Sequence, residues 1–198
     1  MVHDLPTKLT ELINSIEDIK LEEIPEYRLY ISQLEEFFDK KLGKVSNDDE
    51  ERKAISKTMI QNYIKDGLLM PPEGKSYNRS HVILLAIIYN LKSILSIRDI
   101  RRLLNPILKD VNNEDGSSEI DSLYENYLKL KTESVHNMSK SLYELAGKAM
   151  DHNIAAGKSD DEQDKIRLLL FISVLIAEAN YRKRIAEHLI DEYFENID

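Results

Sequence analysis

The residues best suited to chemistry form one polar stripe on a helix predicted between residues 56 and 66. Positions i, i+3, i+4 and i+7 share one side of a helix, and here they are Thr58, Gln61, Asn62 and Lys65. Amide side chains can hydrogen-bond to the edges of bases, and Lys65 with the neighbouring Lys57 can bind phosphates. The stripe is therefore suited to nucleic acid, although a solvated helix face of the same composition is the plain alternative.

The opposite side of this predicted helix is apolar, and both of its ends carry capping residues. Its apolar positions follow the spacing of a buried face and are Met59, Ile60, Tyr63 and Ile64. Ser56 is placed to cap the first turn. Gly67 fits the left-handed position that ends a helix. These features predict a short helix that is held by its apolar side and exposes its polar stripe.

The segment after this helix predicts a wing. A Leu-Leu pair can return the chain to the core, after which Pro71 and Pro72 exclude helix and stiffen the backbone. The loop 73–77, Glu-Gly-Lys-Ser-Tyr, is small, polar and basic. We expect it to form a two-stranded wing that carries Lys75 towards a phosphate backbone.

Two neighbouring helices must hold this segment in place. The first covers about residues 30–42, and its apolar positions suit the scaffold helix of a helix-turn-helix. The second begins at Asn78 or Ser80 and is apolar nearly all round from 82 to 89. A helix that is apolar on every side is buried, so we expect this one at the centre of a core.

This order of residues resembles the MerR-type winged-helix DNA-binding domain. The resemblance rests on Ile55-Ser56, Ile60, Tyr63, Gly67-Leu68-Leu69, Pro72, Lys75, Tyr77 and Leu95-Ser96-Ile97. It implies a transcriptional regulator that binds double-stranded DNA through the helix 56–66 and the wing 71–78. The residues expected to contact DNA are Lys57, Thr58, Gln61, Asn62, Lys65, Lys75, Tyr77 and Arg79.

Residues 24–105 also resemble an uncharacterised bacterial family, one of the numbered domains of unknown function. The shared positions lie between Lys57 and Tyr63, at Tyr77 and His81, and around Tyr89 and Asp99.

The chain departs from the MerR pattern in two ways. Gln61 stands where MerR proteins have a phosphate-binding Arg, and residues 43–53 are inserted before the polar helix.

Charge is divided unevenly along the 198 residues. The net charge is −9, yet residues 51–110 carry 11 Lys and Arg against 5 Asp and Glu. Residues 1–50 and 111–198 are both acidic. The local field of the basic third, rather than the net charge, is expected to govern affinity for nucleic acid.

Composition also limits the cellular compartment in which we expect the protein and the kinds of reactive site that it can contain. The chain has no cysteine, so thiolate metal sites and thiol nucleophiles are excluded. Its most apolar segment, 168–177, is far shorter than the roughly 20 residues of a membrane span. The N-terminal residues lack the apolar core of a signal peptide. We expect a cytoplasmic protein that has no contact with a membrane.

The remaining pattern predicts an all-α protein with a winged helix-turn-helix in residues 1–110 and a long-helix hairpin in 111–198. An extra helix opens the chain at residues 5–20, and Pro106 marks a helix end or a kink. In the second part, one long helical pattern runs from 120 to 150, either continuous or broken near His136, and another runs from 162 to 194. The last stripe is more apolar surface than one partner helix covers, so we expect a homodimer.

Three rival functions are weaker on sequence grounds. A metalloenzyme would need more than the single Glu133-Ser-Val-His136 pair, and no phosphate loop or nucleophile motif is present, so we expect no enzyme activity and no cofactor. A sensor of an unknown small-molecule effector would need a pocket in the C-terminal hairpin, with candidate lining residues Tyr124, Tyr127, Met138, Phe171 and Tyr181. An interaction module that has lost DNA binding is the third rival.

Overall fold

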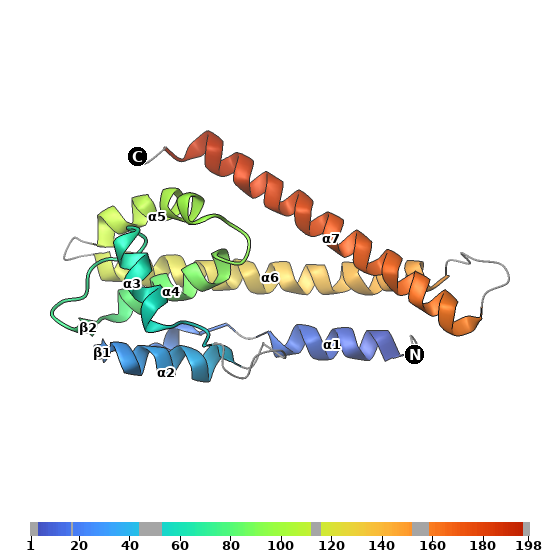
Figure 1. Ribbon diagram of the computed structural model, residues 1–198, viewed down its shortest axis with the longest axis horizontal. Coiled ribbons are helices and arrows are strands. Elements are labelled where there is room, and N and C mark those ends of the chain that lie inside the picture. Colours follow the sequence, from blue (N-terminus) through green and yellow to red (C-terminus); the bar gives the residue numbers. More distant parts are fainter. Residues whose placement is uncertain (1–3, 17, 44–52, 112–115, 152–158, 196–198) are drawn as a thin grey trace. The chain divides into compact units, whose positions relative to one another are not determined.

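The computed structural model describes residues 4–16, 18–43, 53–111, 116–151 and 159–195 (Figure 1). These residues form seven α-helices, one short 3-10 helix and one two-stranded sheet. The predominance of helix confirms the all-α expectation. The chain divides into two compact units, one of residues 1–16 and 130–185 (unit 1) and one of residues 17–129 and 186–198 (unit 2).

Unit 2 contains the sheet and the central helices. In chain order its elements are η2 (Leu21–Glu23), β1 (Leu29–Tyr30), α2 (Ile31–Leu42), α3 (Lys57–Lys65), β2 (Ser76–Tyr77), α4 (Arg79–Leu91) and α5 (Ile97–Val111). The start of α6 (Gly116–Asp151) and the end of α7 (Asp160–Tyr193) also belong to it. The predicted insertion 43–53 lies largely outside the described residues.

The sheet of unit 2 joins two segments that lie far apart in sequence. β1 pairs antiparallel with β2, with Leu29 opposite Tyr77 and Tyr30 opposite Ser76. Within the predicted wing, Glu73 forms a single antiparallel bridge with Ser76. The wing is therefore shorter than predicted, because Ser76 and Tyr77 use their backbone groups to pair with β1.

The core of unit 2 is built around α4. Its residues Ser80 to Ala86 and Ile88 are all buried, as the unbroken apolar run predicted. Asn78 caps the helix by accepting a hydrogen bond from the His81 backbone N–H. The same hydrophobic cluster contains Ile60 of α3 and Tyr124 of α6. The Tyr124 hydroxyl, buried with its ring, donates a 2.7 Å hydrogen bond to the Ile19 carbonyl.

The helix α3 begins and ends as its sequence predicts. The Ser56 hydroxyl accepts a hydrogen bond from the Met59 N–H. Gly67 has a φ of +71°, and the Leu68 and Leu69 N–H groups both donate to the Tyr63 carbonyl. A tight left-handed turn thus closes the helix and sends the Leu-Leu pair into the core, where both side chains are buried.

Two positions at which a helix end or a break was considered lie inside continuous helices. The helix α5 continues through Pro106 to Val111, so the proline does not end the helix. The helix α6 runs without interruption through His136. Proline at 106 removes one N–H donor, and the rest of the α5 turn pattern is kept, with Leu104 buried beside Ile100. The predicted division between residues 110 and 111 falls at the end of α5, next to residues outside the described part of the chain.

Unit 1 consists of α1 (Leu5–Ser15), the later part of α6 and most of α7. Its small core contains Leu9, Ala146, Ala149 and Phe171. The hydroxyl groups of Thr10 and Tyr143 lie 2.7 Å apart and join α1 to α6. The predicted division into 1–110 and 111–198 differs from these units, since α6 and α7 each contribute to both.

We predict that Gly67→Ala lowers the free energy of unfolding by about 1–2 kcal/mol, because an L-residue at positive φ is strained. A Cβ at this position would also lie 3.3 Å from Nε of Arg101. Gly43→Ala is the matched control, since Gly43 ends α2 at a φ of −68° and its new Cβ would meet only Asp39 at 4.0 Å. Urea unfolding measures both variants, and equal stability of the two would contradict the role of Gly67.

Candidate nucleic-acid interface

The predicted polar stripe of α3 is exposed in the structure. All five of its candidate residues are exposed: Lys57, Thr58, Gln61, Asn62 and Lys65. The opposite side is fixed by Ile60, which is 0% exposed, and Tyr63, which is 6% exposed. The exposed and buried residues alternate with the helical period, so α3 cannot rotate about its axis without exposing Ile60. Five amide, hydroxyl and ammonium groups are therefore held on one outward face (the α3 face).

The turn after α3 adds one further exposed cation. Gly74 has a φ of +65° and, with the Glu73–Ser76 bridge, makes a tight turn that leaves Lys75 exposed. The carboxylate of Glu73 in this turn is paired with Arg28, whose Nη1 lies 2.5 Å from Oε2. The hydrogen bond from Arg28 lowers the pKa of Glu73, so the Glu73 carboxylate stays ionised and paired at neutral pH.

Two of the eight predicted contact residues are engaged elsewhere, and the first is Tyr77. It is 4% exposed, pairs with Leu29 in the sheet and lies edge-on to the ring of His81. Burial raises the pKa of its hydroxyl. A side chain in this place packs in the core, so its assignment to DNA contact is corrected. Sequence spacing alone did not separate it from Lys75, two residues away.

Arg79 is also removed from the candidate contacts. Its guanidinium group donates to both carboxylate oxygens of Asp121, with Nε 2.9 Å from Oδ2, and to the backbone carbonyls of Leu21 and Ile24 at 3.0 and 2.6 Å. Only 15% of the side chain is exposed. Arg79 thus ties the start of α4 to α6 and to the segment before β1, which is a structural role.

A carboxylate already lies at the N-terminus of α3. The Lys57 N–H donates a 2.7 Å hydrogen bond to Oε1 of Glu35 in α2, and the Lys53 ammonium group is 3.4 Å from the same oxygen. Helix N-termini commonly bind anions, and here Glu35 supplies one from within the protein. A phosphate at this end of α3 would therefore have to be bound by lysine side chains rather than by this backbone N–H group. Nothing in the local sequence indicates this contact, because Glu35 lies 22 residues before Lys57.

Two arginines of α5 lie in different surroundings. Arg102 is buried, and its guanidinium group donates to Asp191 and to the carbonyls of Ile190 and Phe194 at the end of α7. Arg101 lies beside Gly67, at the turn that follows α3. Arg101 therefore stands near the α3 face, whereas Arg102 is paired with an acidic residue, Asp191.

His81 connects the turn to the core. Its Nδ1 lies 3.2 Å from the Asn78 backbone N–H, which donates to it, and its Nε2 lies 3.4 Å from the Pro71 carbonyl. The ring is 3% exposed, and its burial lowers the pKa of the imidazole. Neutral His81 thus fixes the Pro71 segment against the first turn of α4. The exposed turn that carries Lys75 begins from this fixed segment.

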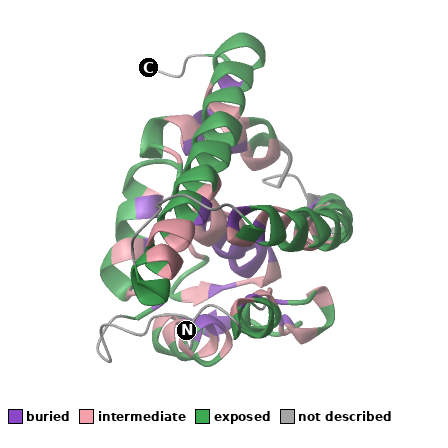
Figure 2. Ribbon diagram, turned by 90° about the vertical axis from the view of Figure 1, so that its right-hand side faces the viewer, coloured by how far each residue is buried: buried purple, intermediate pink, exposed green. Residues whose placement is uncertain are grey.

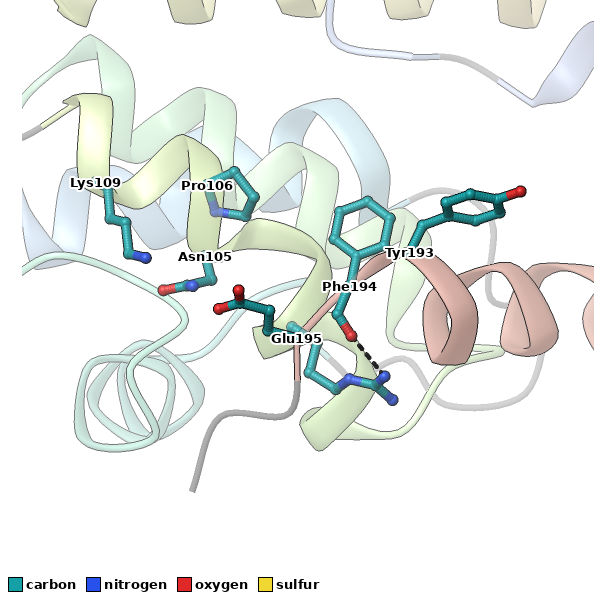
Figure 3. A pocket seen from close by; sticks show the side chains of 7 residues that line it. Asn105, Pro106, Lys109, Tyr193, Phe194 and Glu195 are labelled. Carbon is teal, nitrogen blue, oxygen red and sulfur yellow. Dashed lines mark hydrogen bonds between the residues drawn. The ribbon is translucent and has the colours of Figure 1, made fainter.

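A cavity in unit 2 is formed by α5 and the last described residues of the chain. Its volume is about 470 Å³, and its lining residues, drawn in Figure 3, include Asn105, Lys109 and Glu195 beside the buried Arg102. Four of the aromatic residues considered for an effector pocket can be described within their own units. Tyr124 and Tyr127 stack in the core of unit 2, Phe171 belongs to the core of unit 1, and Tyr181 is exposed.

The described residues contain no group of three or more His, Asp or Glu side chains placed to hold a metal ion. Glu133 and His136, whose spacing suggested a ligand pair, are both exposed on α6. In the part of the chain that the structure describes, every helix is too short or too polar to cross a membrane.

A family described as a domain of unknown function (DUF1836) matches residues 19–127, more than half of the chain. This match confirms that residues 24–105 resemble an uncharacterised family of unknown function. The matched residues contain the sheet, α2 to α5 and the α3 face. No curated protein and no solved structure matches the chain.

We predict that the free energy of unfolding falls as the pH drops below about 6.5. Burial lowers the pKa of His81 in the folded state, so the unfolded chain takes up a proton on this imidazole at a higher pH than the folded protein does. The contribution is complete above the unfolded pKa and is lost as the pH falls through the folded pKa. Thermal melts at pH 7.5 and 5.5 measure it. His81→Gln keeps an acceptor for Asn78 and should show a smaller change between these pH values. An equal change in both proteins would contradict the assignment.

Proposed function

The chain belongs to the DUF1836 family, and from the geometry of its α3 face we propose that it is a DNA-binding transcriptional regulator with a MerR-like winged helix. The observation that carries the proposal is the exposure of all five polar residues of α3 on the side opposite buried Ile60 and Tyr63. A short helix held in this way is the part of a helix-turn-helix that enters the major groove.

The order of elements supports the same proposal. A strand, two helices, a bridged turn, a second strand and two further helices follow one another as β1, α2, α3, β2, α4 and α5. This is the order of the MerR-type winged helix. The turn that carries Lys75 corresponds to the wing, and its closing strand pairs with β1.

The proposed mechanism separates positioning from base recognition. Lys57, Lys65 and Lys75 neutralise phosphates and release counterions, which makes the affinity depend steeply on salt. Gln61 and Asn62 point their amides at base edges, with adenine as the preferred partner of an amide in the major groove. These two tasks fall on different side chains, so substitutions can test them separately.

A second candidate function is a protein-interaction module on the same scaffold. It is favoured by Glu35, whose carboxylate occupies the N-terminus of α3, and by Gln61, which stands where MerR proteins have a phosphate-binding Arg. The acidic residues outside 51–110 also oppose a polyanion at long range. Failure of the full chain to bind mixed-sequence duplex DNA even at low salt would favour this module over the regulator.

We predict that Lys57→Glu with Lys75→Glu weakens binding of the full chain to mixed-sequence duplex DNA and reduces the slope of log affinity against log salt by about 2, one for each lost phosphate contact. Lys8→Glu with Lys148→Glu is the matched control. It makes the same change in net charge at two exposed lysines of unit 1. Gel-shift titrations at several salt concentrations measure both slopes.

The comparison of these two double variants shows which surface of the protein binds DNA. Loss of affinity in the Lys57 and Lys75 variant alone supports binding through the α3 face. Equal loss in both would show that only net charge matters, and equal retention would place the DNA on another surface. Either of these last two results contradicts the proposal.

We further predict that Gln61→Ala with Asn62→Ala removes sequence preference and leaves the salt slope unchanged, because the amides read bases and carry no charge. Selection of bound duplexes from a random pool yields the wild-type preference. Each lost amide contact should reduce discrimination between preferred and random duplexes by about 1–3 kcal/mol. A variant that keeps the wild-type preference would exclude these two residues from base recognition.

A further inference from the structure

The middle of α7 exposes apolar side chains on more than one side. Within residues 168–177 only Phe171 is fully buried, and α7 is mostly exposed in Figure 2. Three large residues lie on one side of α7 and are about half exposed or more: Leu169 at 62%, Ile172 at 49% and Ile176 at 56%. An apolar stripe of this kind marks a surface that binds a partner.

This stripe continues in both directions with polar residues at the same spacing. Steps of three and four residues lead along one line of α7, here called the α7 seam: Glu162, Lys165, Leu169, Ile172, Ile176, Asn180 and Lys183. Every one of these residues is exposed, and all lie in unit 1. Steps of three and four residues are the spacing by which one helix packs lengthwise against another, and from Glu162 to Ile176 they alternate strictly.

The seam is complementary to itself when reversed. About the point between Ile172 and Ser173, Leu169 and Ile176 are equally distant, and so are Lys165 and Asn180. Glu162 and Lys183, at the two ends, are also equally distant from this point. A second copy laid antiparallel would therefore place apolar residues on apolar residues in the middle and a carboxylate against an ammonium group at each end.

We propose that the chain forms a homodimer in which two α7 seams pack antiparallel about a two-fold axis beside Ile172. Such an isologous contact uses one patch twice, which is how most homodimers are built. A parallel pair would set Glu162 against Glu162 and Lys183 against Lys183, and these like charges oppose it. The self-complementary order of charges selects a second copy over an unrelated partner.

The second apolar line of α7 is less exposed at its centre, where Leu170 and Val174 are only 38% and 40% exposed. Reversal about the same point would also bring Arg167 towards Glu178. Arg167, however, is only 25% exposed and already lies 3.4 Å from Asp164 of its own helix. The dimer is proposed independently of DNA binding, because no residue of the α3 face takes part in it.

Charge reversal tests the antiparallel order. Glu162→Lys alone and Lys183→Glu alone each set like charges together at both ends of the dimer, so each should raise the dissociation constant about tenfold or more. A mixture of the two variants should form a heterodimer with near wild-type affinity. In that heterodimer both ends hold opposite charges again, since one copy is cationic and the other anionic at positions 162 and 183. Sedimentation velocity measures all three samples and the wild type.

The outcomes of this test are distinct. Glu162 also accepts hydrogen bonds from the backbone N–H and hydroxyl of Ser159, so Glu162→Lys can loosen the first turn of α7. Lys183→Glu leaves these hydrogen bonds of Glu162 intact, and circular dichroism checks the helix content of both variants. A monomeric wild type, or a mixture no tighter than its components, would overturn the proposal.

Cysteine cross-linking tests the axis, and the chain has no cysteine that would interfere. Ile172→Cys should form a covalent dimer under mild oxidation, since the two copies of residue 172 lie beside the axis. Val174→Cys, on the other line of α7, is the matched control and should stay largely uncross-linked. Cross-linking of Val174→Cys in preference to Ile172→Cys, or of neither, would overturn the seam.

Discussion

The burial of α4 on nearly all sides is the constraint on which unit 2 depends. A helix whose residues from Ser80 to Ala86 are all inaccessible must be covered by several elements, and the shared hydrophobic cluster draws on α2, α3, α5 and α6. Arg79 and His81 strengthen this arrangement at the start of α4. Arg79 binds Asp121 and two carbonyls, and His81 holds the Pro71 carbonyl. The turn with Lys75 is therefore attached to the most deeply buried helix of the unit.

The direction of the α3 face follows from this core. Ile60 and Tyr63 belong to the same cluster as α4, so the side of α3 that carries Gln61 and Asn62 is left outside. The result is a short, capped helix with a rigid base and an exposed polar surface. Glu35 limits what this surface can bind, since its carboxylate accepts the hydrogen bond of the Lys57 N–H at the helix N-terminus, where an external anion would otherwise bind. The fold positions the α3 face, and the chemistry of this face determines what it can bind.

Much of unit 2 could be predicted from local sequence. Ser56, Gly67 and Asn78 act at the helix ends where their types predict, and most of the run from 82 to 89 is buried, as its composition demands. The predicted roles of Tyr77 and Arg79 were wrong because both residues contact partners that are distant in sequence. The burial of Tyr77 follows from pairing with Leu29, and the fate of Arg79 from Asp121, 42 residues later. The helix α5 continues through Pro106, and Ile107 and Leu108, which follow it, still pack against the core of unit 2.

Amide chemical shifts offer the most direct test of the central claim, that the basic third of an acidic chain presents a polar helix face to DNA. Isotope-labelled full-length protein would be titrated with duplex DNA at low salt. The account predicts shifts at residues 57–65 and around Lys75, with the amides of unit 1 unchanged. Shifts confined to other surfaces, or none at any DNA concentration, would contradict it.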